Sequence, residues 1–194
     1  MQHILPCTYF GSIPFFRALN GQKVVLERHE HFVKQTDRSR CLILGANGPL
    51  YISIPVSKPF GNKTAMKDIH VCYATDWQRI HWKAIESAYA SAAYFEDYSE
   101  QIKNIIFSNQ KYLIDLNLSS IELISNFLDL PITFKLSTKY EEKGIDFRSL
   151  VFENKSIAPY YQLFPYSEEY SYQFSILDLI FSEGPMARKW IVSD

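Results

Sequence analysis

The sequence predicts an α/β fold: a single domain in which a small mixed sheet with a hairpin is covered by a helical layer. The chain has 194 residues, of which 47% are hydrophobic and 21% charged, and this suits one soluble globular domain with its own core. Short strand-like runs dominate residues 4–74, and segments with helical spacing dominate residues 76–129. The sequence has no internal repeat or low-complexity tract, so we expect one domain over residues 1–194.

Five segments are expected to supply the strands of the sheet, namely 4–10, 23–33, 41–56, 68–74 and 132–137. The clearest is the third, RCLILGANGPLYISIPV, in which two apolar runs flank Asn47–Gly48. This dipeptide is typical of a tight β-hairpin turn, so the sequence predicts a hairpin there.

Helix signals occur at both ends of the chain and between the strands. Pro14 suits the first turn of a helix in IPFFRALNG, which Asn20–Gly21 would end. Further helices are expected from Thr75 or Asp76 into an Ala-rich stretch, over about 97–109, up to about 129, and, with amphipathic character, in FSILDLIFSEG. Little order is expected over 139–158, and the ring-rich segment that follows it reads as a loop.

Charge is distributed unevenly, although the formal net charge is only −1. Residues 1–83 carry 11 Lys/Arg and 5 Asp/Glu, and residues 84–194 carry 9 and 16, so the first part is at +6 and the second at −7. The basic part could focus anions, or the basic and acidic faces could simply pair in the fold. Nucleic-acid binding is disfavoured, because the basic part contains no recognised nucleic-acid module.

Cysteine usage and the N-terminus indicate a cytoplasmic protein. Cys7, Cys41 and Cys72 are odd in number and lack metal-ligand spacing, which favours free thiols in a reducing compartment. The N-terminus has no secretory signal pattern, and no apolar run is long enough for a membrane span.

The segment LERHEHFVKQTDRSRC is unusually rich in histidines and cations. His29 and His31 would share one face of a strand, where solvent exposure is the simpler interpretation than a metal site, because no third ligand stands at matching spacing. Arg38 and Arg40 would form a fork for a phosphate or carboxylate, with Lys34 adding a charge. The alternative is a strand edge kept soluble by charge.

A second candidate segment is DWQRIHWKAIESAY. On a helix, His81 lies on the same face as Trp77, near the N-terminus, where it could bind or protonate a ligand. The alternative is a half-buried core histidine. The phosphate-loop, dinucleotide-binding and nucleophile-elbow motifs are absent from the sequence.

Five blocks in this order resemble the WbqC-like family of bacterial proteins, in the shorter form typical of Bacteroidetes. They are LPCTYF, HEHFVKQTDRSRC, GANGPLYISIPV, DWQRIHWKAIESAYASAAYFEDY and FSILDLIFSEGP. The resemblance implies a role in O-antigen or other surface-polysaccharide biosynthesis, for which amino-acid transfer onto a sugar is one suggested activity. Two departures stand out: Leu5 replaces a histidine of longer members, and residues 137–173 hold only one glycine where those members have a Gly-rich segment.

Combining the motifs and the resemblance, we expect a transferase that attaches an amino-acyl or similar group to a sugar nucleotide or glycan. His81 would be the general base, no metal site is expected, and the cofactor stays open. The anion- and substrate-binding residues would be Tyr9, Lys34, Gln35, Arg38, Arg40, Trp77, Arg79 and Trp82. The alternative is a non-catalytic ligand-binding or assembly protein on the same scaffold. The tail MARKWIVSD could dock on a second copy to make a homodimer, or it could pack on its own domain.

Overall fold

A four-stranded parallel sheet forms the centre of the computed structural model, which describes residues 1–20, 23–131, 133–148, 158–164 and 174–192. The strand order is β7 (Lys135–Leu136), β2 (Val24–Glu27), β1 (His3–Pro6), β8 (Ile145–Asp146). His3 pairs with Val24 on one side and with Ile145 on the other, so both edges of β1 are occupied.

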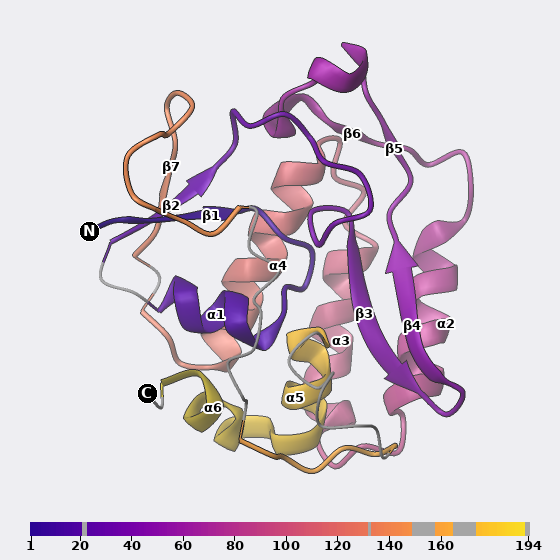
Figure 1. Cartoon of the computed structure of the whole chain (residues 1–194). Coiled ribbons are helices and arrows are strands. Elements are labelled where there is room, and N and C mark those ends of the chain that lie inside the picture. The colour runs from indigo at the N-terminus through magenta and orange to yellow at the C-terminus, as the bar shows by residue number, and fades with distance from the viewer. Residues whose placement is uncertain (21–22, 132, 149–157, 165–173, 193–194) are drawn as a thin grey trace.

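Helix α1 (Ile13–Leu19) connects β1 to β2 and packs beside β1 (Figure 1). Pro14 occupies its first turn, as predicted. Backbone N–H groups have no intrahelical acceptor at this position, so a proline costs no hydrogen bond. β1 and β2 are largely buried because their apolar runs lie at the centre of a sheet with packed faces.

The predicted hairpin is present as β3 (Arg40–Gly45) and β4 (Gly48–Ser53). Gly45 pairs with Gly48, and Gly48 adopts a φ of +101°, which glycine reaches without a steric penalty. A second antiparallel pair, β5 (Val56–Ser57) and β6 (His70–Val71), is connected through the short turns η1 (Gly61–Lys63) and η2 (Met66–Asp68).

The α/β class is confirmed, but the strands are divided over three sheets instead of joining one. Since β2 and β8 occupy both edges of β1, the hairpin finds no place beside the central strand. Its β3 strand packs instead against helices α2 and α5. The strand expected over 23–33 ends at Glu27, so His29 and His31 lie in the segment after it and do not share a strand face.

The helical layer follows the predicted segments closely. Its members are α2 (Trp77–Tyr89), α3 (Phe95–Ile106) and α4 (Leu113–Phe127), with Asp76 at the N-cap position of α2. The chain then ends with α5 (Ile176–Glu183), η4 (Gly184–Ala187) and α6 (Arg188–Val192). No helix among these described residues is long and apolar enough to cross a bilayer.

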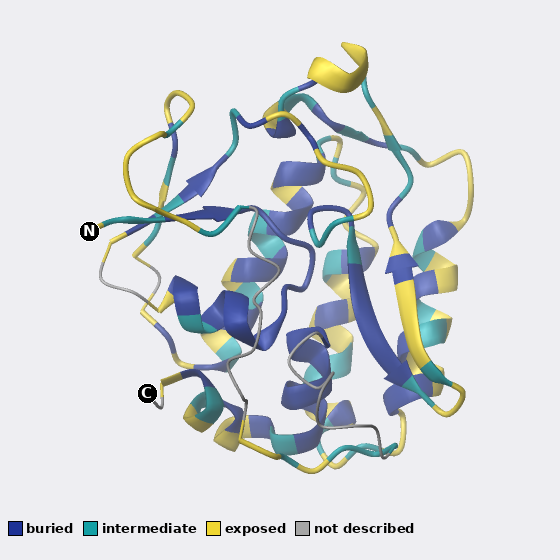
Figure 2. Ribbon diagram, viewed as in Figure 1, coloured by how far each residue is buried: buried dark blue, intermediate teal, exposed yellow. Residues whose placement is uncertain are grey.

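Two expectations for the C-terminal part are wrong. Helix α5 was expected to be amphipathic, with one face open to solvent. Residues Ile176–Ser182 are instead all buried, and the helix lies in the interior of the fold (Figure 2). The stretch 139–158 contains β8, which pairs with β1, although residues 149–157 lie outside the described residues. The C-terminal tail packs on its own domain, where Ile191 is buried and α6 contacts α1.

Candidate functional site

The carboxyl ends of the four parallel strands meet at one edge of the sheet, and this edge gathers most of the buried charge. The chain passes from β1 through α1 to β2 on one side, and only later returns to the other side of β1 as β8. Open α/β sheets bind ligands at such a reversal, in the crevice beyond the carboxyl ends of the strands. The candidate site is therefore formed by the residues that follow β1, β2, β7 and β8.

A buried ion pair lies beyond β2. Arg38 donates from Nε to Glu30 Oε1 at 2.7 Å and from Nη2 to Glu30 Oε2 at 2.6 Å, and both side chains are almost fully excluded from solvent. The same Nη2 donates to the backbone oxygen of Arg148 at 3.1 Å, which joins this pair to the end of β8. The guanidinium is thus held rigidly in a bidentate contact.

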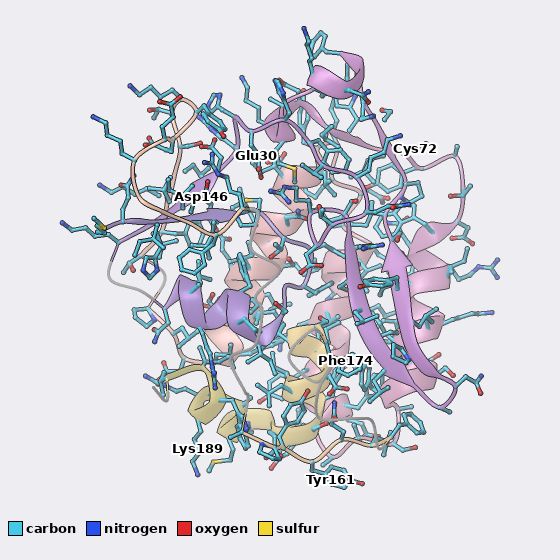
Figure 3. The ribbon with its side chains drawn as sticks, in the orientation of Figure 1. Glu30, Cys72, Asp146, Tyr161, Phe174 and Lys189 are labelled. Atoms are coloured by element: carbon cyan, nitrogen blue, oxygen red, sulfur yellow. The ribbon has the colours of Figure 1, made fainter. Side chains whose placement is uncertain are left out.

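Arg148 and Glu27 continue this network. Arg148 donates to both oxygens of Asp146 at 2.9 and 2.6 Å, and its Nη1 lies 3.7 Å from Glu27 Oε2. The hydrogen bonds from Arg148 lower the pKa of Asp146. Glu27 is fully buried and accepts hydrogen bonds from the His29 and Glu141 amides and from the Ser137 hydroxyl. Figure 3 shows Glu30 and Asp146 on this side of the molecule.

Asp37 lies beside the network but is only half-buried. Burial raises the pKa of its carboxyl group, and the charges of Arg40 and Arg38 partly oppose that rise. Its backbone oxygen accepts from the Tyr9 amide at 2.8 Å, so it stands next to the residues that follow β1. Asn117 of α4 fixes this arrangement by donating to the backbone oxygens of Cys7 and Arg38 at 3.0 and 2.8 Å.

His81 contacts the end of β1 through Tyr9. Its Nδ1 lies 3.3 Å from the Tyr9 hydroxyl and its Nε2 lies 3.0 Å from the Ser53 backbone oxygen. A carbonyl oxygen only accepts, so Nε2 carries the proton and Nδ1 accepts from Tyr9. Burial lowers the pKa of His81 to about 4, and burial raises that of Tyr9 well above its usual value. Both side chains are buried, so at neutral pH they form an uncharged core pair.

Arg40 is the predicted cation that remains partly accessible. Its guanidinium lies 3.9 Å from the centre of the exposed Tyr51 ring, and it stands opposite Ser53 in the hairpin ladder. Within the described part of the chain, its buried Nε has no hydrogen-bond partner. The same holds for four buried atoms around the edge: Thr8 Oγ1, His29 Nε2, Asn117 Oδ1 and Arg148 Nη1. Unpaired buried polar atoms are rare, and a water or ligand would satisfy them.

The structure brings only part of the predicted site together. The charges of Arg38 and Arg40 both act on Asp37, and Tyr9 of the Tyr9–His81 pair donates its amide to the Asp37 backbone oxygen. The Trp77 ring centre lies 4.9 Å from that of His81. Lys34 and Gln35 are exposed in the segment just before.

The other two predicted residues have different partners. Arg79 is exposed and pairs with Asp76 at 2.5 Å. Trp82 stacks on Phe95 and lies under Lys103. The contacts therefore do not join all five of Lys34, Arg38, Arg40, Arg79 and His81 around one point.

Sequence reasoning missed the four carboxylates of the site and one of its arginines. The missed residues are Glu27, Glu30, Asp37, Asp146 and Arg148. Glu27 and Asp146 each end a strand, and polar residues at that position are the signal that could have found them. No group of three or more histidines, cysteines, aspartates or glutamates in the described ranges is placed to hold a metal ion.

Comparison with known proteins gives one match. The model of the WbqC-like protein family matches residues 7–147, which begin just after β1 and include α1, β2, the hairpin, helices α2 to α4 and both β7 and β8. Neither the curated proteins nor the solved structures contain a significant match.

Proposed function

Since the chain belongs to the WbqC-like protein family, we propose that it binds a small anionic substrate at the carboxyl edge of its parallel sheet and transfers an amino-acyl or similar group onto a sugar nucleotide or glycan. One observation carries the proposal. Asp37 is half-buried with a raised pKa, is close enough to Arg38 and Arg40 for their charges to act on its carboxyl group, and lies beside the end of β1. A carboxyl group whose pKa is perturbed by burial and by nearby charges is a common feature of active sites.

The side chains at this edge suit different roles. Arg40 would bind the phosphate or carboxylate of the substrate, because its side chain is partly accessible and, among the described residues, forms no ion pair with a carboxylate. Asp37 would accept the proton of the attacking sugar hydroxyl or amine as the new bond to the acyl carbon forms. The bond from that carbon to the phosphate of an activated acyl donor would break, and the phosphate would leave with the electron pair beside Arg40. Arg38 is saturated by Glu30 and would hold the segment in place.

The general-base role expected for His81 is not carried into the proposal. Its burial and its low pKa leave it a weak base without access to substrate, and both nitrogens are engaged. We give it a positioning role instead. Its Nδ1 accepts a hydrogen bond from the Tyr9 hydroxyl and so orients Tyr9, whose amide donates to the Asp37 backbone oxygen. The exposed ring of Tyr51, stacked on Arg40, offers an apolar wall for a sugar.

A non-catalytic binding or assembly protein is the second candidate. It is favoured by the way the buried charges pair with one another: Glu30 with Arg38, and Glu27 and Asp146 with Arg148. Such a network holds a scaffold together without needing a substrate.

The leading proposal, the transferase, also includes surface-polysaccharide biosynthesis, a cytoplasmic location, a homodimer and the absence of nucleic-acid partners.

The first test is thermal stabilisation of the purified protein by a panel of sugar nucleotides, amino acids and ATP. A ligand at a hundredfold excess over its Kd adds about 2.7 kcal/mol to the free energy of unfolding, which raises the Tm by several degrees. The Arg40→Gln variant should lose the stabilisation. The matched control is Arg188→Gln, which removes an exposed arginine paired with Asp129 elsewhere on the molecule, and it should retain the stabilisation.

The Asp37→Asn variant separates the two candidates once a ligand is found. A transferase should keep the ligand-induced stabilisation and lose turnover of that ligand with a sugar acceptor. If the wild-type protein is stabilised by the ligand but turns nothing over, the binding-protein candidate replaces the transferase. A ligand that stabilises the Arg40→Gln variant as strongly as the wild type would contradict the proposed site.

A further inference from the structure

A cationic surface lies next to the candidate site, on the outer side of the segment that contains Glu30. Two exposed segments form it, residues 31–34 and residues 58–67 between β5 and β6. We call it the basic ledge, and its members are His31, Val33, Lys34, Lys58, Phe60, Lys63 and Lys67.

Backbone hydrogen bonds hold the two segments of the basic ledge side by side. The Phe32 amide donates to Thr64 O at 3.0 Å, the Met66 amide donates to Glu30 O at 2.9 Å, and His31 forms a β-bridge with Ala65. Met66 and Phe32 are buried beneath. The ledge is therefore a defined surface whose side chains are displayed on a fixed backbone.

In the described part of the chain, none of the lysines of the ledge forms an ion pair with a carboxylate. Lys34, Lys63 and Lys67 are exposed, whereas the buried Glu30 of the first segment is already engaged by Arg38. Lys58 hydrogen-bonds to Asn62, and local desolvation and the adjacent charge of Lys34 lower the pKa of its ammonium group. Two ammonium groups this close repel each other, and an anion between them would relieve the repulsion.

An apolar tip projects from the ledge. Phe60 is 69% exposed and lies at the turn η1, which protrudes at the top of Figure 1, and Val33 on the neighbouring segment is 49% exposed. An exposed aromatic ring on a protruding turn, surrounded by lysines, cannot enclose a small ligand. It matches a broad anionic surface that also offers an apolar layer, as the headgroup region of an acidic bilayer does.

We propose that the basic ledge docks the protein on an anionic lipid surface, with the lysines against the headgroups and Phe60 inserted between them. The inference goes beyond the proposed reaction and does not depend on it. Because the Glu30–Arg38 pair lies directly behind the ledge, docking would also bring the carboxyl edge of the sheet close to the membrane surface.

The test is co-sedimentation of the full chain with vesicles of phosphatidylglycerol and, separately, of phosphatidylcholine. The wild-type protein should sediment with the first and not with the second, and binding should fall as salt is added. The combined variant Lys34→Glu, Lys58→Glu, Lys63→Glu should bind at least about a hundredfold more weakly, since each cation near an acidic bilayer contributes roughly fivefold. Phe60→Ser should weaken binding at every salt concentration.

The matched control reverses three other exposed lysines, Lys23, Lys83 and Lys143, and so changes the net charge by the same amount. It should bind vesicles nearly as well as the wild type. Equal loss of vesicle binding in the two triple variants would overturn the proposal that the basic ledge is the docking surface, because binding would then depend only on net charge. Undiminished vesicle binding by Phe60→Ser would overturn the insertion of Phe60 and leave only electrostatic attachment through the lysines. Circular dichroism and the Tm of each variant identify any loss of fold.

Discussion

At the scale of single residues, burial decides what each arginine can do. Removing one partner of the buried Arg38–Glu30 pair would leave an uncompensated charge, which typically costs about 3–5 kcal/mol. The exposed Arg79–Asp76 pair contributes at most about 1 kcal/mol, because water screens it. Arg38 therefore stabilises the fold, whereas Arg79 forms a surface ion pair that adds little stability. Arg40 is half-buried and, among the described residues, pairs with no carboxylate, which is why the proposal gives it the anion-binding role.

The pKa of His81 leads to a prediction about stability and pH. Burial lowers this pKa to about 4 in the folded state, against roughly 6.5 in the unfolded chain. The unfolded state therefore binds more protons between these values, so the stabilising effect of neutral His81 is complete above about pH 6.5 and is lost as the pH falls towards 4, by about 3 kcal/mol in all. Urea unfolding at a series of pH values should show this loss.

Two comparisons identify His81 as its source. His81→Gln should unfold more easily at neutral pH and should lose this part of the pH dependence, whereas the exposed His31→Gln should behave as the wild type. In NMR titrations the His81 ring should keep the chemical shifts of a neutral imidazole from about pH 8 to about pH 5. An imidazole that protonates near pH 6.5 would contradict the buried Tyr9–His81 pair and restore His81 as a candidate base.

At the scale of elements, the end of α5 depends on a glycine. Gly184 follows the helix with a φ of +54°, and a Cβ at this position would collide with the Tyr94 ring. Gly184→Ala should therefore lower the free energy of unfolding by more than the roughly 1–2 kcal/mol that a left-handed alanine costs alone. Gly61, with a φ of +60° and open space around it, is the matched control, and Gly61→Ala should show only the conformational cost. Equal losses in chemical denaturation would disprove the contact with Tyr94.

Elements with local signals were predicted well, and elements that depend on distant partners were not. The Asn47–Gly48 turn and the helix start at Asp76 have local signals, so the hairpin and the beginning of α2 were found close to their true positions, whereas α2 ends at Tyr89, several residues before the expected end. Strand β8 has two residues, Ile145 and Asp146, and owes its existence to pairing with β1, some 140 residues earlier in the chain. No local pattern could have revealed it, because a two-residue strand has no periodicity.

The same reasoning explains why the candidate site was only half predicted. Arg38 and Arg40 attracted attention because they are close in sequence. Glu27, Asp146 and Arg148 join one another and Arg38 only because the strands run parallel and their carboxyl ends coincide. His81 shows the opposite error: its sequence surroundings suited catalysis, but the packing of Tyr9 and Ser53 around it makes it a core residue.

At the scale of the whole molecule, the family match and the folded unit differ in extent. The match ends at residue 147, whereas α5, beyond it, lies in the interior and contacts α1, α3 and β3. Its five buried apolar side chains are Ile176, Leu177, Leu179, Ile180 and Phe181. At about 1.5–3 kcal/mol each they contribute roughly 7–15 kcal/mol, which is as large as the whole stability of a typical domain.

This comparison predicts that a chain of residues 1–147 does not fold on its own. It should show no cooperative transition in thermal or urea unfolding and little dispersion of its amide resonances, because the hydrophobic surface that α5 covers would be open to water. Adding residues 148–194 as a separate polypeptide should restore cooperative unfolding, since that fragment supplies both α5 and the Arg148 partner of Glu27. Cooperative unfolding of 1–147 alone would instead place the domain boundary at the end of the family match, and the single domain predicted over residues 1–194 would be wrong.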